Sequence, residues 1–228
     1  MKGIYTLLFS LIVLVMFSAC NDEWKEEQFE HYISFKAPIN SNGVTRINLS
    51  YSETGKTTYR LPILVSGSTK NDRDITVKIG IDADTLRTLN IARFSSREDL
   101  WYREMPSKHY SFPETVQIKA GENVGYLDIE FDLTGLDLVD KWVLPLTIED
   151  APNGEYKPNY RKHYRKALLR VMPFNDYSGT YSSSGMNVYL GESNNDPATT
   201  STRTVRVVDD KSVFFYDGTW WEEDEHRY

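Results

Sequence analysis

The residue with the clearest chemical role in this sequence is its only cysteine, Cys20. It follows the small residues Ser18 and Ala19, which end a short apolar run that begins behind the positive Lys2. The run is shorter than the roughly 20 residues of a spanning helix, and small residues suit a signal peptidase. We therefore expect residues 1–19 to be a lipoprotein signal peptide and Cys20 to be lipidated. The alternative is an ordinary secretory signal, with its cysteine there by chance.

The lipidated thiol has consequences for the rest of the chain. Without a second cysteine no intramolecular disulfide forms, so the core alone must hold the fold together. Acyl chains on Cys20 make the membrane a partner of the protein. The acidic start, Asn21-Asp22-Glu23, resembles the export signal that sends Bacteroidetes lipoproteins to the outer face of the outer membrane. We expect residues 20–30 to form a tether. The alternatives to an export signal are a solvated charge run in this tether, or an anchor that faces the periplasm.

Other candidates for chemistry are weak. The sequence contains no G-x-S-x-G, H-E-x-x-H, P-loop or G-x-G-x-x-G motif, and its 4 histidines lack metal-ligand spacing. We expect no catalytic residue, cofactor or metal. Asp128, Glu130 and Asp132 share one face of an expected strand and could hold Ca²⁺. A solvated outer face, opposite the apolar residues between them, is the favoured interpretation.

Aromatic residues make up 13% of the chain, and sugar rings stack on exposed aromatic faces. The candidate glycan-binding residues are Trp101, Tyr102, Tyr110, Trp220 and Trp221; structural packing is the alternative for each. Tyrosines also alternate with basic residues over residues 156–166, which favours an anionic glycan or a polar strand edge. The net charge of −7 argues against nucleic acid or an anionic membrane as a partner.

One triplet points to a modification. Asp84-Thr85-Leu86 resembles the O-glycosylation acceptor of Bacteroidetes, which is Asp, then Ser or Thr, then an apolar residue. The resemblance makes Thr85 a candidate O-glycosylation site.

These side chains must be positioned by strands, because period-two alternation dominates residues 31–172. The clearest strands are expected at residues 32–35, 59–65, 75–81, 116–118, 127–133, 142–148 and 167–171. Pro62 cannot donate to a ladder, so the strand that contains it is expected to lie at a sheet edge or to begin irregularly. Residues 82–89 could form a short helix or a long loop. The fold class predicted is mainly β, an immunoglobulin-like antiparallel β-sandwich over residues 31–172.

The remaining residues, 173–228, form a separate segment behind a boundary at 172–178. Strand-like stretches lie at 185–190, 204–208 and 212–216, around a loop rich in Ser and Asn. About 55 residues give only a marginal core. We expect a small, partial β module, or one that leans on the sandwich.

Several features together carry a family resemblance. They are the cysteine with its acidic start, the alternating strands, Ala120-Gly121-Glu122 and Trp142-Val143-Leu144-Pro145-Leu146. Residues 30–172 resemble domain-of-unknown-function family 1735, the N-terminal immunoglobulin-like domain of Bacteroidetes surface lipoproteins. Residues 174–228 resemble a companion C-terminal family, number 4361. The resemblance implies a SusE/SusF-like accessory lipoprotein beside a SusC/SusD-like glycan transporter, and it brings no binding residues with it.

The sequence thus predicts a noncatalytic lipoprotein of the outer membrane that faces the cell exterior and binds polysaccharide beside a SusC/SusD-like transporter. The alternative is a structural or adhesive surface lipoprotein, which would space other modules or join a pilus or envelope assembly. An enzyme of glycan breakdown is the third hypothesis.

Overall fold

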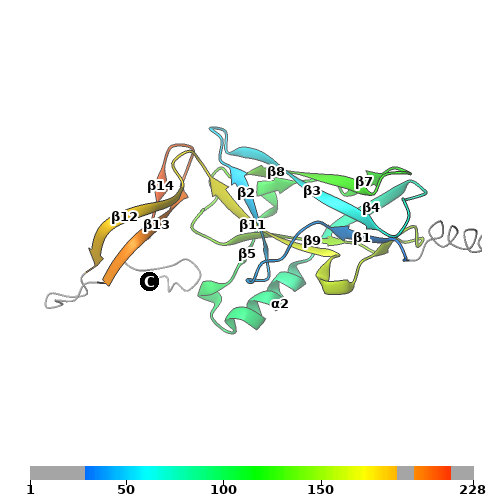
Figure 1. The fold of residues 1–228 in the computed structure, drawn as a ribbon, viewed down its shortest axis with the longest axis horizontal. Helices are drawn as coiled ribbons and strands as arrows, with labels where there is room; N and C mark the ends of the chain where they lie inside the picture. The colour runs from blue at the N-terminus through cyan, green and yellow to red at the C-terminus, as the bar shows by residue number, and fades with distance from the viewer. Residues whose placement is uncertain (1–28, 189–197, 217–228) are drawn as a thin grey trace, which may run out of the picture.

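The computed structural model describes residues 29–188 and 198–216, which form three β-sheets and one α-helix. The described chain begins at one end of a two-layer sandwich, and a small three-stranded sheet lies beyond the opposite end (Figure 1). Within these residues, no helix is long and apolar enough to cross a membrane.

The first layer is a five-stranded sheet in the order β10-β1-β3-β8-β6. Its strands are β1 (Tyr32–Phe35), β3 (Lys56–Ser66), β6 (Tyr110–Ser111), β8 (Val124–Asp132) and β10 (Lys157–Pro158). Alternate residues of β3 and β8 point into the sandwich, as their period-two pattern predicts, and Leu61, Ile63, Leu127 and Ile129 are fully buried there.

The second layer contains six strands, with the path β2-β11-β9-β4-β7 and β5 paired beside β9. They are β2 (Thr45–Ser50), β4 (Ile75–Ile81), β5 (Arg103–Glu104), β7 (Thr115–Ile118), β9 (Trp142–Ile148) and β11 (Lys166–Phe174). The main hydrophobic core lies between the two layers.

The predicted mainly β sandwich is confirmed, with one refinement. The sheets are mixed, since β1 pairs with β10, β2 with β11 and β5 with β9 in parallel. Each of these pairs joins segments far apart in the chain, so no local hairpin signal announces them.

The expectation that Pro62 marks an edge strand is wrong. β3 lies inside the sheet, between β1 and β8. The pairing with β1 ends at Phe35↔Ile63, and the Pro62 carbonyl accepts a hydrogen bond from the Lys36 N–H just beyond it. Because the N–H and C=O of one residue point to the same side of a strand, the missing Pro62 donor falls past the end of β1. The ladder therefore lacks only the reciprocal bond to Lys36, beyond the last paired residue of β1.

Residues 82–89, which could have been a helix or a loop, begin the helix α2 (Ala83–Phe94). Asp82 caps it, because its side chain accepts a hydrogen bond from the Thr85 N–H. Leu86 points down onto the outer face of the second layer, where it joins Val143, Leu168 and Tyr102 in a second hydrophobic cluster. Short 3-10 turns lie at η1 (Glu98–Leu100), η2 (Ser107–His109) and η3 (Arg161–His163).

The third sheet consists of β12 (Gly179–Val188), β13 (Ala198–Val207) and β14 (Val213–Phe214). Strand β11 runs across the predicted boundary at residue 173 and leads into it. The buried Asn175 ties the two parts together, as its side-chain amide donates to the Asp209 carbonyl at 2.8 Å. Of the side chains described in this sheet, Val207 is the one buried hydrophobic residue.

Candidate functional site

The outer face of the five-stranded sheet carries a hollow of about 390 Å³ where β3, β8 and β6 lie side by side. Its walls mix charged, hydroxyl and aromatic side chains. The lining residues are Lys56, Thr57, Thr58, Lys108, Tyr110, Ser111, Glu130, Phe131 and Asp132. We call this the β3/β8 hollow.

Strand register sets the polar groups of the hollow opposite one another. In the strand register, Lys56 of β3 lies opposite Asp132 of β8, and Thr58 of β3 lies opposite Glu130 of β8. On the other side of β8, Ser111 of β6 lies opposite Glu130. The residues between them face the core, so the outward positions are free to be polar. A row of Ser, Glu and Thr therefore crosses three strands.

The contacts of these groups decide what they can offer a ligand. The Ser111 hydroxyl donates to a Glu130 carboxylate oxygen at 3.2 Å. Hydrogen bonds from the Thr134 side chain and backbone hold the pKa of Asp132 below its ordinary value, so this carboxylate is charged at neutral pH. Lys56 and Lys108 form no ion pair with any residue in the described ranges. The hollow thus presents donors and acceptors together, which suits a polyhydroxylated ligand.

The same outer face continues along the strands to an exposed aromatic ring. Arg60 and Asp128 form a two-pronged ion pair at 2.6 and 3.1 Å, and the Arg60 guanidinium lies 5.5 Å from the centre of the Tyr126 ring. Tyr126 is 53% exposed. It is four residues from Glu130, roughly 13 Å along the strand. Sequence reasoning missed Tyr126, although its outward phase in the alternation of β8 was readable.

The five aromatic candidates do not come together. Tyr110 is half-buried at the hollow, where its ring stacks on Phe112 with centres 5.9 Å apart. Trp101 is half-buried elsewhere, and its indole N–H donates to the Ser95 carbonyl at 3.3 Å. Trp220 and Trp221 lie outside the described residues.

Tyr102 requires a correction. It is only 4% exposed, in the cluster beneath α2, and its ring meets Phe94 edge to face at 5.6 Å. A sugar cannot reach it in this fold. The irregular segment that contains it is pinned by the buried Asn90, which bonds both the N–H and the C=O of Tyr102 at 2.9 Å. This tertiary contact is invisible in the local sequence.

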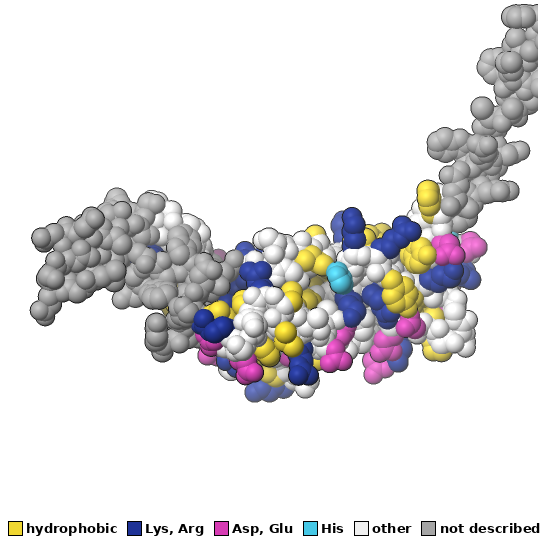
Figure 2. All heavy atoms as spheres, turned by 90° about the horizontal axis from the view of Figure 1, so that it is seen from below, with side chains coloured by type: hydrophobic (Ala, Val, Ile, Leu, Met, Phe, Trp, Pro, Cys, Tyr) yellow, Lys and Arg dark blue, Asp and Glu magenta, His cyan; other side chains and the backbone are white. Residues whose placement is uncertain are grey.

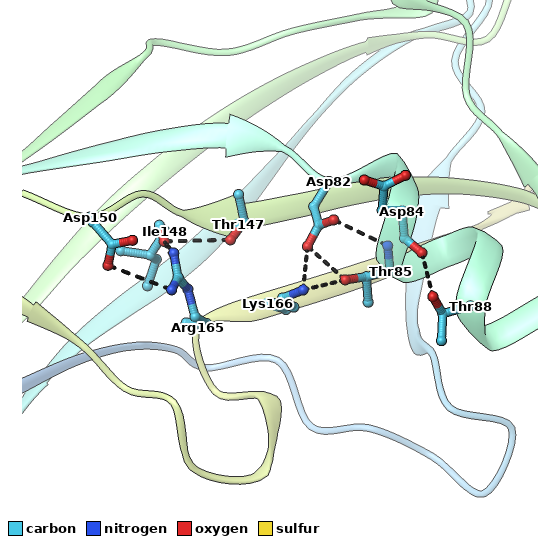
Figure 3. Close-up of polar contacts among 9 residues, drawn as sticks. All are labelled: Asp82, Asp84, Thr85, Thr88, Thr147, Ile148, Asp150, Arg165 and Lys166. Atoms are coloured by element: carbon cyan, nitrogen blue, oxygen red, sulfur yellow. Dashed lines mark hydrogen bonds and ion pairs between the residues drawn. The ribbon is translucent and has the colours of Figure 1, made fainter.

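Thr85 lies in a polar cluster at the start of α2 (Figure 3). Its hydroxyl donates to Asp82 at 2.7 Å and accepts from Lys166, whose ammonium also lies 2.7 Å from the Asp82 carboxylate. Burial raises the pKa of Asp82, but the hydrogen bonds from Lys166 and Thr85 outweigh it and bring the pKa below its ordinary value. Glycosylation of Thr85 would remove the hydroxyl hydrogen that Asp82 accepts. The assignment of Thr85 stays a prediction.

Metal binding has no visible centre in the described part of the chain, where no three His, Cys, Asp or Glu side chains form a ligand group. Of the three carboxylates considered for Ca²⁺, Asp128 is held by Arg60 and Asp132 by Thr134. Their strand face is the solvated outer face that the alternation predicts.

The fold is therefore that of a modular β protein. It consists of a two-layer β-sandwich with a polar hollow on one outer face, joined to a small third sheet. A family model described as Domain of unknown function (DUF4973) matches residues 24–152, more than half of the chain. The chain therefore belongs to the DUF4973 family. A second model, of a C-terminal domain, matches residues 165–228.

Solved structures from Bacteroides are similar to this chain. One from Bacteroides ovatus, of unknown function, is 49% identical, with 85% of this chain and 64% of that chain covered and a TM-score of 0.73. Another from this species, named a multidomain protein including DUF1735, is also 49% identical, with 84% and 63% covered and a TM-score of 0.72. This chain thus spans less than two thirds of either. None of the curated proteins matches it.

A Bacteroides thetaiotaomicron structure named an auxiliary nutrient binding protein is 40% identical, with 86% of this chain and 67% of that chain covered and a TM-score of 0.70. The prediction of a Bacteroidetes-type protein built from domains of unknown function is confirmed at this level. The matching N-terminal model is DUF4973, and DUF1735 enters only through the name of one relative.

Proposed function

We propose that this protein is a noncatalytic cell-surface lipoprotein, anchored through Cys20, that binds polysaccharide beside a SusC/SusD-like transporter of the outer membrane. The observation that carries the proposal is the 40% identical relative named an auxiliary nutrient binding protein. The relative whose name includes DUF1735 supports the resemblance to family 1735, on which the SusE/SusF-like part of the proposal rests.

The β3/β8 hollow is the proposed ligand site, with Tyr126 as its aromatic extension. A sugar needs hydrogen-bond donors and acceptors for its hydroxyls and an aromatic face for its C–H groups. Glu130, Thr58 and Lys56 supply the hydrogen-bonding groups, and Tyr126 supplies the aromatic face.

The position of the hollow also supports the proposal. Ser66, at one end of β3, is the strand partner of Tyr32, which lies near the start of the described chain. Lys56, which lines the hollow, is at the other end of β3. Ten residues of strand separate them, roughly 33 Å. An anchor on Cys20 would therefore leave the hollow at the end of the sandwich far from the attachment point.

The test is affinity electrophoresis of the chain from residue 21 onward, in gels that contain each of a panel of polysaccharides. We expect retardation by at least one glycan. Glu130→Gln weakens a charge-assisted hydrogen bond and should lower that affinity about tenfold. Tyr126→Ala removes a stacking surface and should lower it about fivefold.

Matched controls separate the site from general surface effects. Glu114→Gln changes the same charge on an exposed position of the other layer, and Tyr177→Ala removes another exposed tyrosine. Both should leave the retardation unchanged. Retardation by no glycan would favour the structural or adhesive alternative, and release of reducing sugar would favour an enzyme.

A further inference from the structure

The segment between β10 and β11 forms a basic, tyrosine-bearing loop beside the start of the described chain. Residues 156–166 contain five Lys or Arg and no Asp or Glu, so this segment is a local exception to the net charge of −7 that argues against an anionic membrane for the chain as a whole. We call residues 159–164 the anchor-side loop. It runs along β1, because the Asn159 N–H donates to the Ile33 carbonyl and the Tyr164 carbonyl accepts from the Phe35 N–H, each at 2.8 Å.

Much of the charge around this loop is already paired within the protein. Lys157 pairs with Glu30 at 2.7 Å, and Lys166 pairs with Asp82. Arg165 binds the Ile148 carbonyl at 2.8 Å and approaches Asp150 at 3.6 Å. What remains is Arg161 and Lys162, which are exposed and form no ion pair with any described residue.

The loop backbone is held in an unfavourable conformation. Lys162 and His163 both have positive φ values, 47° and 65°, although neither is glycine. Such backbone persists only where its surroundings fix it, and it often marks a functional surface. The fixing contacts are visible: the Tyr160 hydroxyl donates to Asp150, and the Arg165 guanidinium stacks 4.6 Å from the Tyr160 ring centre.

Two tyrosines complete the surface. Tyr160 is 63% exposed and Tyr164 is 46% exposed, on either side of the free basic pair. Figure 2 shows Lys and Arg side chains mixed with hydrophobic ones, and with Asp and Glu, on the face seen from below. Tyrosine rings with basic neighbours suit the membrane–water interface. There the ring is partly buried among lipid chains, and the cation is attracted to the lipid phosphates.

The short distance between the anchor-side loop and the lipid on Cys20 indicates that the loop contacts the membrane. Cys20 precedes Phe29, the first described residue, by nine positions, so its acyl chains lie within about 30 Å of Phe29 even if the segment is fully extended. The loop lies at this end of the sandwich, since Lys157, just before it, is the strand partner of Tyr32 and forms an ion pair with Glu30. We propose that Arg161, Lys162, Tyr160 and Tyr164 rest on the anionic headgroups of the membrane that holds the lipid. This rests on the lipid anchoring in the proposed function and adds an orientation to it.

The test uses vesicles and the chain from Cys20 onward, without added lipid. Phosphatidylcholine vesicles with and without phosphatidylglycerol are sedimented with the protein at low and high salt. We expect binding to the anionic vesicles alone, and its loss in high salt. Arg161→Ala with Lys162→Ala should lower the partition coefficient about 25-fold, since each basic residue near an anionic surface contributes about fivefold.

A matched control removes the same charge elsewhere. Arg87→Ala with Lys211→Ala takes one exposed cation from α2 and one from the C-terminal sheet, and should bind vesicles as the unmodified protein does. As a second measurement, the single thiol of Cys20 is coupled to a maleimide lipid, which reproduces the anchor. Anionic vesicles should then slow tryptic cleavage after Arg161 and Lys162 relative to neutral vesicles.

The outcomes separate this proposal from the proposed function. Equal binding to neutral and anionic vesicles, or equal tryptic cleavage on both, overturns the membrane contact. If the Arg161/Lys162 double variant instead loses retardation by an acidic polysaccharide, the loop is a glycan site and the membrane proposal is wrong. Failure of the proposed function would appear separately, as absence of retardation in a protein that still binds anionic vesicles.

Discussion

Asp82 joins the helix α2 to the sheet beneath it, and removing its charge should destabilise the fold by a predictable amount. The carboxylate does two things: it caps α2 by accepting from the Thr85 N–H at 3.1 Å, and it pairs with Lys166 at 2.7 Å. Asp82→Asn keeps a capping oxygen but loses the ion pair. Asp82→Ala loses both and also the Thr85 hydroxyl contact.

The magnitudes follow from the exposure of the pair. The side chains of Lys166 and Asp82 are 32% and 16% exposed, so we assign their attraction about 1 kcal/mol, near the upper end for surface pairs. A lost cap adds about 1 kcal/mol, and the hydroxyl contact somewhat less. We expect Asp82→Asn to lower the free energy of unfolding by about 1 kcal/mol and Asp82→Ala by about 2.5 kcal/mol. In a protein of this size that lowers the Tm by about 3 and 7 °C.

The dependence on pH provides a second check. Because the pKa of Asp82 lies below its ordinary value of 3.8 in the folded protein, its contribution is complete above that value. The contribution is then lost as the pH falls through the folded pKa. The difference in unfolding free energy between the unmodified protein and Asp82→Asn should therefore shrink below about pH 4.

Urea unfolding followed by tryptophan fluorescence, at neutral pH and at about pH 3, measures both effects. Asp84→Asn is the control, since it removes an exposed carboxylate from the same helix end without breaking an ion pair, and should cost about 0.5 kcal/mol. The reasoning is refuted if Asp82→Asn and Asp84→Asn behave alike, or if the Asp82→Asn effect is equally large at both pH values.

Three further perturbations test other contacts. Asn90→Ala leaves the buried N–H and C=O of Tyr102 without their partner and should cost about 3 kcal/mol in urea unfolding, whereas a loss below about 1 kcal/mol would contradict that role. Arg60→Ala removes an ion pair whose side chains are 64% and 48% exposed, so its midpoint of urea unfolding should stay close to that of the unmodified protein, and a large shift would contradict this weak role. Thr85→Ala tests the glycosylation prediction by intact mass of protein purified from the native organism: the variant should lack one glycan mass, and identical excess mass in both proteins would exclude Thr85.

The sandwich could be predicted from the sequence where burial imposes a period of two. Leu127, Ile129 and Phe131 alternate with acidic residues because one face of β8 is buried and the other is exposed to solvent. This pattern can be recognised within the strand itself. The pairing partners were not predictable in the same way. The register that sets Lys56 opposite Asp132 joins residues 76 positions apart, and nothing in either segment encodes the other.

The candidate site shows the same limit. Tyr102 and Tyr110 lie in one irregular segment with similar local surroundings, yet Asn90 pulls Tyr102 beneath α2 while pairing with β8 sets Tyr110 at the hollow. Composition could identify both as aromatic candidates but could not separate them. An aromatic residue in a strand usually packs inward, and only the phase of Tyr126 in the alternation of β8 indicates that it points outward.

The geometry of β3 relates the glycan site to the membrane contact, and the membrane contact depends only on the lipid anchor of the proposed function. One end of the strand pairs with β1 beside the anchor-side loop, and the other end forms the hollow, roughly 33 Å away. A tether alone would let the sandwich rotate about Cys20, so that the hollow would point in every direction. Contact between the loop and the membrane would restrict that rotation and hold the hollow away from the lipid. A glycan captured there would then be presented at a defined height, which raises its effective concentration at a neighbouring transporter. The Arg161/Lys162 double variant should consequently keep its affinity for glycan in solution while losing a defined orientation on the membrane.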